Sequence, residues 1–594
     1  MEAALFAYVV TEGKIGFDAL RKELRKQLPE YMIPTYFMEL EEIPVTVNGK
    51  VDKNRLPQIS IRSDSEYIAP RNAKEEALAE AIEEIMAPHS VSMKDSFFEL
   101  GGDSIKAIRI VSHLRERNLS LAVSDIMTGA AVEEIALYIE DLSENTYDQG
   151  QHTGPVTDTP MLRMFRHWNL AKPQHFNQAV ILPMEGSVDA LRYALNALTE
   201  HHDILRSVYR DGNQEILPYM ENRHFALTTY TVPWDAEARA WIGERCEEVQ
   251  ASMELPEGPL VKACLFDTGR ERVLMLAIHH LLVDSVSWHI LLEDLDSGME
   301  AYAEGRALGL PLKTASFQQW ATALEDYAAS AELRKEQGYW DSVFQGLSRG
   351  KLRQGVFGGS DRREAYFSLT EEQTQALLTE ACNTYHTQVA DLLLAAMAMA
   401  VRQYSGQSQV ALCLEGHGRE TIHVPMDIDR TVGWFTCAYP VLLPCDAQVS
   451  EAIIETKELL RKIPNHGLGF GLLYPPSALD DIDIYFNYVG QSEEGAEEDY
   501  YPGATCDKDN EVGGPINFNG GISKGKLSFH ITSGRGWNQS FDLGELAEEY
   551  HRQLLAVLDH CLSSEESYRT YADIDAQDLE EEDFDEIAAL LGLT

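Results

Sequence analysis

The feature that most constrains the fold is a strand-like apolar run that ends in two histidines and leads into an amphipathic helix. Residues 273–278 are uninterrupted apolar residues, with the length and composition of a buried strand. His279 and His280 follow directly, and apolar residues then recur at helical spacing over residues 288–295. Because a strand end holds side chains rigidly, this position suits a proton-transfer group. A histidine beside an apolar run is more often a buried structural residue, so the pair alone leaves both interpretations open.

Three further motifs follow this stretch in order. They are Glu415-Gly416-His417-Gly418-Arg419-Glu420, then residues 430–436, then Phe486-Asn487-Tyr488-Val489-Gly490-Gln491. With the double histidine, the set resembles epimerization domains of nonribosomal peptide synthetases, which belong to the condensation-domain superfamily. The resemblance spans roughly residues 155–570. It implies two α/β lobes of the chloramphenicol-acetyltransferase type, about residues 155–360 and 361–570, meeting at a tunnel.

Length and composition are those of a multidomain globular protein with an extreme charge. The chain has 594 residues, 44% hydrophobic and 24% charged, enough for about four domains. A net charge of −47 argues against a nucleic-acid or anionic-membrane surface, which needs a local excess of Lys and Arg. No apolar run is long enough to span a bilayer, no secretory signal begins the chain, and the eight cysteines lack metal-ligand spacing. The expectation is a cytoplasmic protein without a metal.

Residues 1–60 resemble the end of an adenylation domain, a small α+β subdomain. Residues 28–34 and 48–53 match that family's last motifs, and residues 47–51 predict a hairpin with Asn-Gly at its turn. In the family the lysine that matches Lys50 approaches the acyl-adenylate. The large substrate-binding portion is absent from the sequence, so we expect Lys50 to be idle here and a separate adenylation core to be a partner.

Residues 68–145 resemble a peptidyl carrier domain, a four-helix-type bundle. Residues 95–104 match its attachment motif, in which Ser104 would carry 4′-phosphopantetheine, added by a phosphopantetheinyl transferase. Helices are expected near residues 74–86, 104–117 and 132–142. A helix that begins at Ser104 would favour the phosphodiester through its unpaired amides and dipole. Alone, Ser104 could be a mere helix cap, but the whole motif and its neighbours favour attachment.

The resemblance implies that the chain inverts the Cα of an aminoacyl or peptidyl thioester from L to D. Such a reaction removes the α-proton and returns it on the opposite face, so it needs proton-transfer groups on both sides of Cα. The family pattern places one role on His280 and leaves His279 structural, while Glu415 follows a second predicted strand, residues 409–414. His280 and Glu415 are therefore the predicted pair, and which acts in which direction stays open. Apart from the pantetheine arm, no cofactor is expected.

Neighbouring polar residues have more than one interpretation. Asn487 and Tyr488 could bind the enolate or orient the substrate, and they could equally fill the interface between the lobes. Asp284 is expected to be structural and paired with an arginine. His417 and Arg419 are expected to shape their own loop rather than to catalyse.

Two other functions compete with inversion. A condensation domain joins two carrier-bound acyl groups and also uses the second histidine. The motifs at residues 415–420 and 430–436, and Ser285 where condensation domains usually have glycine, argue against it. A docking platform without catalysis would be expected to have lost His280 or Glu415, and both are present.

The last residues of the chain, 573–594, predict a docking element. Between Asp573 and Glu586 there are nine Asp or Glu residues and no Lys or Arg, and apolar residues follow at helical spacing. The segment resembles the short helices by which synthetase subunits recruit the next protein. A downstream condensation domain is thus the expected partner, and a frayed solubilising tail is the alternative.

Overall fold

The computed structural model describes most of the chain. The described residues are 6–9, 36–39, 68–86, 90–95, 97, 100, 104–117, 119–121, 123–126, 131–141, 147–234, 237–349, 363–405, 407–422, 424, 426–445, 448–491, 500–534, 543–564, 568 and 570. The expected hairpin with Lys50 and the expected docking tail lie outside them. The chain divides into two compact units, Met1–Leu100 with Ser124–Ile139, and Gly101–Val123 with Glu140–Thr594.

The first unit holds a strand pair and helices of the predicted carrier. β1 (Phe6–Val9) pairs in parallel with β2 (Tyr36–Glu39). α2 (Ala73–Met86) confirms the first predicted helix and packs against α5 (Val132–Ile135). The backbone amides of Val132 and Glu133 fasten the preceding loop by donating to the Asp95 and Met93 carbonyls, each at 2.9 Å. The third expected helix is shorter than predicted, because α5 and the turn η3 (Ala136–Tyr138) end before residue 140.

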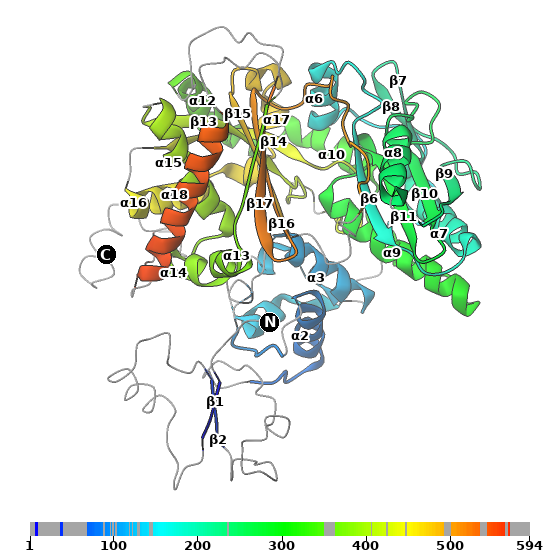
Figure 1. Ribbon diagram of the computed structural model, residues 1–594, viewed down its shortest axis with the longest axis horizontal. Coiled ribbons are helices and arrows are strands. Elements are labelled where there is room, and N and C mark those ends of the chain that lie inside the picture. Colours follow the sequence, from blue (N-terminus) through cyan, green and yellow to red (C-terminus); the bar gives the residue numbers. More distant parts are fainter. Residues whose placement is uncertain are drawn as a thin grey trace. The chain divides into compact units, whose positions relative to one another are not determined.

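The second unit begins with α3 (Ser104–Glu116), which confirms the second predicted helix. β3 (Leu119–Ser120) follows and pairs with β4 (Glu140–Asp141). The residues of β4 had been expected to end the third helix. The one-turn helix α4 (Val123–Ile126) lies across the boundary between the units in the sequence. The rest of the second unit forms two α/β lobes, each built on its own sheet, and confirms the predicted fold class (Figure 1).

The first lobe is built on a four-stranded sheet in which the predicted strand is central. The order is β6 (Asn177–Pro183), β11 (Arg272–His279), β10 (Val261–Asp267) and β9 (Ala226–Thr231). β11 runs antiparallel to both neighbours, and every side chain from Val273 to Ile278 is buried. A strand covered on both faces explains the unbroken apolar run. The predicted helix after the histidines is α9 (Ser285–Glu304), which packs against α7 (Val188–His201).

Smaller elements complete the first lobe and its borders. A three-stranded sheet comprises β5 (Gly154–Pro155), β8 (Asn213–Ile216) and β7 (Ser207–Arg210). The helices are α6 (Pro160–Trp168), α8 (Ala238–Gln250), α10 (Phe317–Ala328), α11 (Ala331–Lys335) and α12 (Gln337–Gly346). Thr159 caps α6 and Pro160 occupies its first turn, where a missing N–H costs nothing.

The second lobe is built on a six-stranded sheet with one face covered by helices (Figure 1). The order is β12 (Arg363–Ser368), β17 (Lys526–Ser533), β16 (Ile516–Ser523), β15 (Ile484–Gln491), β13 (Gln409–Gly416) and β14 (Cys437–Pro444). The helices are α13 (Glu371–Ala376), α14 (Cys382–Tyr385), α15 (Val389–Ser405), α16 (Val449–Arg461), α17 (Phe470–Leu473) and α18 (Leu543–Ser563). Phe518 and Phe529 of the sheet pack on Tyr550 of α18, with ring centroids 5.6 and 5.1 Å away.

Two segments of the second lobe reach across to the first. Residues 417–436, between β13 and β14, form what we call the bridging segment. It contacts the start of α9, where the Gly433 carbonyl accepts from the Ser287 hydroxyl at 3.0 Å. Residues 500–510, between β15 and β16, lie beside β6, and the Asn177 amide donates to the Thr505 carbonyl at 2.7 Å. The lobes are thus joined by hydrogen-bonded backbone as well as by packing. No helix within the described ranges is long and apolar enough to cross a membrane.

Candidate functional site

His279 is a structural residue, as the family pattern predicted. Its side chain is completely buried, and its Nε2 lies 2.8 Å from the Pro173 carbonyl while its Nδ1 accepts from the Leu281 amide at 3.2 Å. Burial lowers the pKa of His279 to about 4, so the ring stays neutral near pH 7. Both ring nitrogens are used by the backbone, which leaves none for a substrate.

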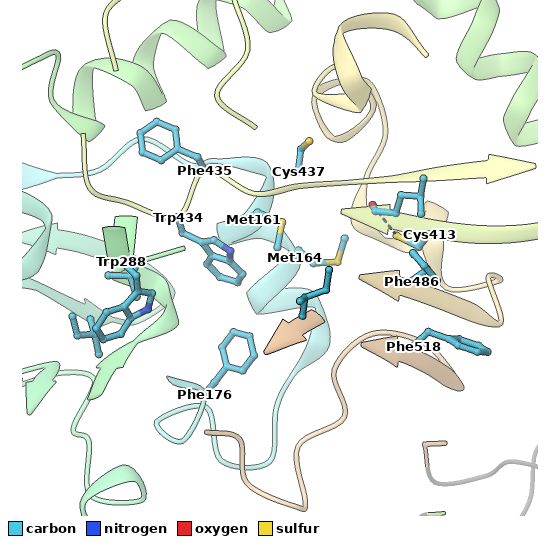
Figure 2. Close-up of a cluster of buried hydrophobic side chains, with 14 of the residues drawn as sticks. Met161, Met164, Phe176, Trp288, Cys413, Trp434, Phe435, Cys437, Phe486 and Phe518 are labelled. Carbon is cyan, nitrogen blue, oxygen red and sulfur yellow. Dashed lines mark hydrogen bonds between the residues drawn. The ribbon is translucent and has the colours of Figure 1, made fainter. Parts of the chain in front are cut away.

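His280 turns out of the strand and lies between aromatic rings from both lobes. β11 ends at His279, and His280 opens the single turn η5 (His280–Leu282), whose first amide donates to the Phe176 carbonyl at 2.9 Å. The imidazole stacks on Phe176 at 5.0 Å and lies against Trp434 of the second lobe at 4.5 Å between ring centroids. Burial lowers the pKa of His280 below its ordinary value, which favours the neutral ring. Figure 2 shows Phe176 and Trp434 in one cluster of buried apolar side chains with Met161 and Met164 of α6.

Glu415 lies near the end of β13, where it pairs with Ala438 of β14. Its side chain is exposed to solvent, yet the surrounding protein desolvates the carboxylate and raises the pKa of Glu415 to about 7. Water thus reaches the side chain, while the protein atoms around it weaken the hydration of the charged form. A carboxyl group with a pKa near 7 can accept or release a proton under neutral conditions.

One short segment connects the surroundings of His280 and Glu415. Trp434, which lies against His280, is followed three residues later by Cys437, and Cys437 pairs with Gly416, the neighbour of Glu415. Three residues of extended chain span at most about 11 Å. The two predicted proton-transfer groups therefore come from different lobes and lie near the two ends of this segment.

Of the two candidates on β15, only Asn487 shares the face of Glu415. β13 and β15 run parallel, and Cys413 pairs with Tyr485. Because side chains alternate between faces, Tyr485 and Asn487 lie on the same face as Cys413 and Glu415. Tyr488 lies on the opposite face, which the helices cover. There it contributes electrostatically to the raised pKa of Tyr550 on α18. The structure does not bring Tyr488 to Glu415.

Asp284 is structural and paired with an arginine, as predicted. It caps α9 by accepting from the Ser287 amide at 2.8 Å, and its other oxygen accepts from the Phe435 amide of the second lobe at 3.0 Å. Arg419 lies 3.4 Å from the same carboxylate, and the two side chains are only 4% and 2% exposed. Asp284 therefore ties the start of α9 to the bridging segment that carries Trp434.

Asp284→Asn is expected to lower the free energy of unfolding by about 3–5 kcal/mol, the usual cost of removing one member of a buried ion pair. The amide keeps a helix-capping oxygen but leaves Arg419 uncompensated and sets an NH₂ group near the Phe435 amide. Urea unfolding followed by tryptophan fluorescence measures the change. The control is Glu304→Gln, which breaks the exposed pair with Arg306 and should cost no more than about 1 kcal/mol. Equal effects of the two variants would contradict the structural role of Asp284.

His417 and Arg419 shape the loop after Glu415, as expected. The Arg419 guanidinium donates to the Ile428 and Thr431 carbonyls at 2.9 and 2.8 Å and stacks on Phe435 at 3.8 Å. The His417 Nδ1 accepts from the Arg419 amide at 3.1 Å. These contacts fold the bridging segment back on itself, so that Phe435 and its neighbour Trp434 face the first lobe.

One group of His and Asp side chains among the described residues has the spacing of a metal site. The potential ligand atoms of His201, His202 and Asp294 lie within 4.8 Å of one another. The Asp294 carboxylate is already shared, with His202 Nε2 at 2.8 Å and with Arg430 Nη2 at 2.5 Å. A guanidinium on that carboxylate opposes a divalent cation, so the group is better explained as an ionic network that joins α9 to the second lobe.

The predicted attachment residue is the first residue of α3. The first turn of this helix contains no acidic residue, whereas the first turn of α2 contains Glu75 and Glu76. The positive end of the α3 dipole is therefore not compensated by the helix itself, which suits a phosphodiester on Ser104. A hydroxyl residue at such a position fits a 4′-phosphopantetheine group.

Several residues at this site had been given no role from the sequence. Gln178 and Phe176 lie beside His280, Trp434 joins the lobes, and Tyr485 shares the face of Glu415. The strand alternation could have indicated Tyr485, had the pairing of β13 with β15 been known. The others depend on contacts between distant segments.

Comparison with known proteins gives the family. A family model described as Condensation domain matches residues 154–580, and one described as Phosphopantetheine attachment site matches residues 76–139. The crystal structure of the epimerization domain from the third module of tyrocidine synthetase B is similar over 70% of this chain and 100% of that one, with a TM-score of 0.65 and 34% identity.

Two curated relatives match along almost the whole chain. Surfactin synthase subunit 1 of Bacillus subtilis is 35% identical over 98% of this chain, and tyrocidine synthase 1 of Brevibacillus parabrevis is 32% identical over 99%. The chain spans 17% of the length of the first and 58% of the second. Since the Condensation model covers most of the chain and follows an attachment-site match that contains Ser104, the chain belongs to the condensation-domain family of nonribosomal peptide synthetases.

Proposed function

We propose that this chain inverts the Cα of an aminoacyl or peptidyl thioester carried on Ser104, converting L to D during nonribosomal peptide synthesis. The observation that carries the proposal is the pair of His280 and Glu415, which differ in chemistry and come from different lobes. Burial favours the neutral form of His280 and the protonated form of Glu415. Two titratable groups whose pKa values are shifted toward one another, one lowered and one raised, are suited to opposite roles in proton transfer.

The protein supplies the proton transfers, and the arm supplies the thioester that holds the amino acid and acidifies its α-proton. In one direction, Nε2 of neutral His280 accepts the α-proton while protonated Glu415 delivers a proton to the opposite face. In the other direction the two residues exchange roles. A pKa near 7 keeps both forms of Glu415 populated at neutral pH, which this exchange requires.

Asn487 is the proposed partner of the developing negative charge. It lies on the sheet face that carries Glu415, and its amide can donate to a thioester oxygen. Tyr488, on the helix-covered face, receives no role in this mechanism. His279 and Asp284 act by holding the turn and the start of α9 in place.

Inversion is favoured over condensation by Glu415. A condensation reaction would use the second histidine but gives no reason for a carboxyl group with a raised pKa on the facing lobe. The 34% identity with an epimerization domain, over the whole of that chain, points the same way. The partners that follow from the proposal are a phosphopantetheinyl transferase, a separate adenylation core and a downstream condensation domain.

The proposal is tested by loading Ser104 and reading the chirality of the amino acid afterwards. A phosphopantetheinyl transferase transfers the aminoacyl arm from a series of aminoacyl-coenzyme A substrates, and the amino acid is hydrolysed and resolved on a chiral column. At least one amino acid should reach the same L/D mixture from either enantiomer. His280→Gln reports the spontaneous racemisation of the thioester. The proposal would be contradicted if every amino acid in the series kept its configuration, apart from the spontaneous racemisation that His280→Gln also shows.

A further inference from the structure

The side chain of Gln178 connects Trp288 to His280, and its orientation is fixed by chemistry. Gln178 lies on β6 opposite Ile278 of β11. The indole N–H of Trp288 can only donate, and it lies 2.7 Å from the Gln178 Oε1. The oxygen of the amide therefore faces Trp288, and the NH₂ group faces His280, with Nε2 to Nε2 at 3.1 Å. A ring nitrogen in contact with an NH₂ donor has to be the acceptor.

The second ring nitrogen of His280 gives the same tautomer independently. Nδ1 lies 2.8 Å from the Val283 carbonyl, which can only accept, so Nδ1 carries the hydrogen. His280 is then a neutral imidazole with its lone pair on Nε2, the nitrogen that the proposed function uses. The fixed donor of Trp288, acting through Gln178, and the fixed acceptor of Val283 thus agree on one state of the ring.

We propose that Gln178, oriented by Trp288, is a positioning residue that keeps Nε2 of His280 unprotonated and covered until an aminoacyl group displaces the amide. An imidazolium would direct its Nε2–H at the Gln178 NH₂, two donors 3.1 Å apart. Protonation therefore requires the amide to turn or leave, at the cost of its bond to Trp288. The inference rests on the proposed function in one respect, that the proton Nε2 takes is the α-proton.

This arrangement assigns the first step of the reaction. The resting protein presents His280 as a base, so the α-proton on the His280 side of Cα is removed first, and Glu415 returns a proton from the other side. Both directions need the Gln178 amide to leave Nε2, but the opposite direction also needs His280 to have gained a proton before the substrate reacts. Asp284, whose charge acts on His280, is paired with Arg419 at 3.4 Å, and His279 is neutral. Gln178 is therefore the group in direct contact that decides the state of Nε2.

The test replaces the donor by an acceptor of the same shape. In Gln178→Glu, one carboxylate oxygen still accepts from Trp288 and the other accepts from an imidazolium. The pKa of His280 should rise by roughly one to three units, as beside an opposite charge. Gln178→Met, which offers neither donor nor acceptor, should give a smaller rise. Titration of the carbon-13-labelled histidines by NMR measures both, with the His280 signal identified by its absence in His280→Gln.

One control variant and a second readout separate this inference from the proposed function. Gln149→Glu adds the same charge at an exposed position and should leave the His280 titration unchanged. In α-deuterium exchange, the rising limb of the pH–rate profile should move to higher pH in Gln178→Glu. The size of that shift should equal the rise in the His280 pKa. A shifted titration in a protein that never inverts would support the positioning role and contradict the proposed function. A parent that inverts, with an unshifted titration in Gln178→Glu, would overturn the positioning role and leave the proposed function standing.

Discussion

Glu415→Gln is expected to slow inversion by roughly 10²–10⁴-fold, the usual consequence of losing a general acid or base. Glutamine keeps the shape of the side chain and its hydrogen-bonding capacity but neither takes nor gives a proton. The fold should tolerate the change, because within the described part of the chain no hydrogen bond or ion pair holds the Glu415 carboxylate. A carboxylate that no described residue holds, at the end of a rigid strand, is placed to react with a group that enters from outside.

The measurement follows loss of α-deuterium and chirality in parallel, starting from each enantiomer of an aminoacyl group on Ser104. His280→Ala should be similarly harmful. Asp284→Asn should act mainly through stability, so its rate per folded molecule should stay close to that of the parent. Exchange without inversion would show one base acting on one face. If Glu415→Gln exchanges and inverts at the parent rate from both enantiomers, the two-residue mechanism is wrong, and Tyr485 on the same face is the next candidate.

The raised pKa of Glu415 also predicts how stability responds to pH. Its folded-state pKa of about 7 lies above the ordinary value of 4.5, so the folded state holds the proton more tightly than the unfolded state. This contribution is fully present below pH 4.5 and is lost as pH rises through about 7. Relative to Glu415→Gln, which lacks the titration, the unfolding temperature of the parent should fall between those values. The same scans show whether the variant is folded.

The local structure around the double histidine could be predicted from the sequence. The apolar run, the turn and the helical spacing are read within about twenty residues, and each is decided by periodicity and capping. Asp284 at the cap of α9 and the burial of His279 follow from the same local rules. His280 was separated from His279 by the family pattern, and the structure shows the physical reason: the turn η5 directs the second ring away from the strand.

The partners of His280 and Glu415 could not be predicted, because they come from distant parts of the chain. Gln178 lies on a strand that enters the sheet about a hundred residues before His280, and Trp434 belongs to the other lobe. Choosing between Asn487 and Tyr488 required the register of β15 on β13, since neighbouring residues of a strand point to opposite faces. Strand pairing across seventy residues leaves no signal in a single sequence.

Two glycines of the motifs have a steric reason that only the folded chain reveals. A Cβ on Gly418, where φ is +68°, would lie 1.8 Å from the Phe435 carbonyl oxygen. A Cβ on Gly433 would lie 2.2 Å from the ring of Phe317. Both sites therefore require glycine so that the bridging segment can pass close to itself and to α10. The motif that sequence reasoning read as a family signature is, physically, the condition for placing Trp434 on His280.

Ser104→Ala is expected to abolish loading completely, because attachment needs the hydroxyl and alanine has none. The parent, incubated with a phosphopantetheinyl transferase and coenzyme A, should gain the mass of one phosphopantetheine, and the variant should gain nothing by intact mass spectrometry. Helix α3 should persist, since alanine is the best helix former and the change lies at the first position of the helix. Far-ultraviolet circular dichroism checks this.

Ser112→Ala is the matched control for the attachment site, because it removes a hydroxyl from the same helix two turns further on. The phosphodiester is favoured at the first turn, where the amides are unpaired and the dipole is positive, and this advantage falls off within that turn. Ser112→Ala should therefore be labelled like the parent. Labelling that survives in Ser104→Ala would overturn the carrier assignment, and with it the tether that the inversion of Cα by His280 and Glu415 requires.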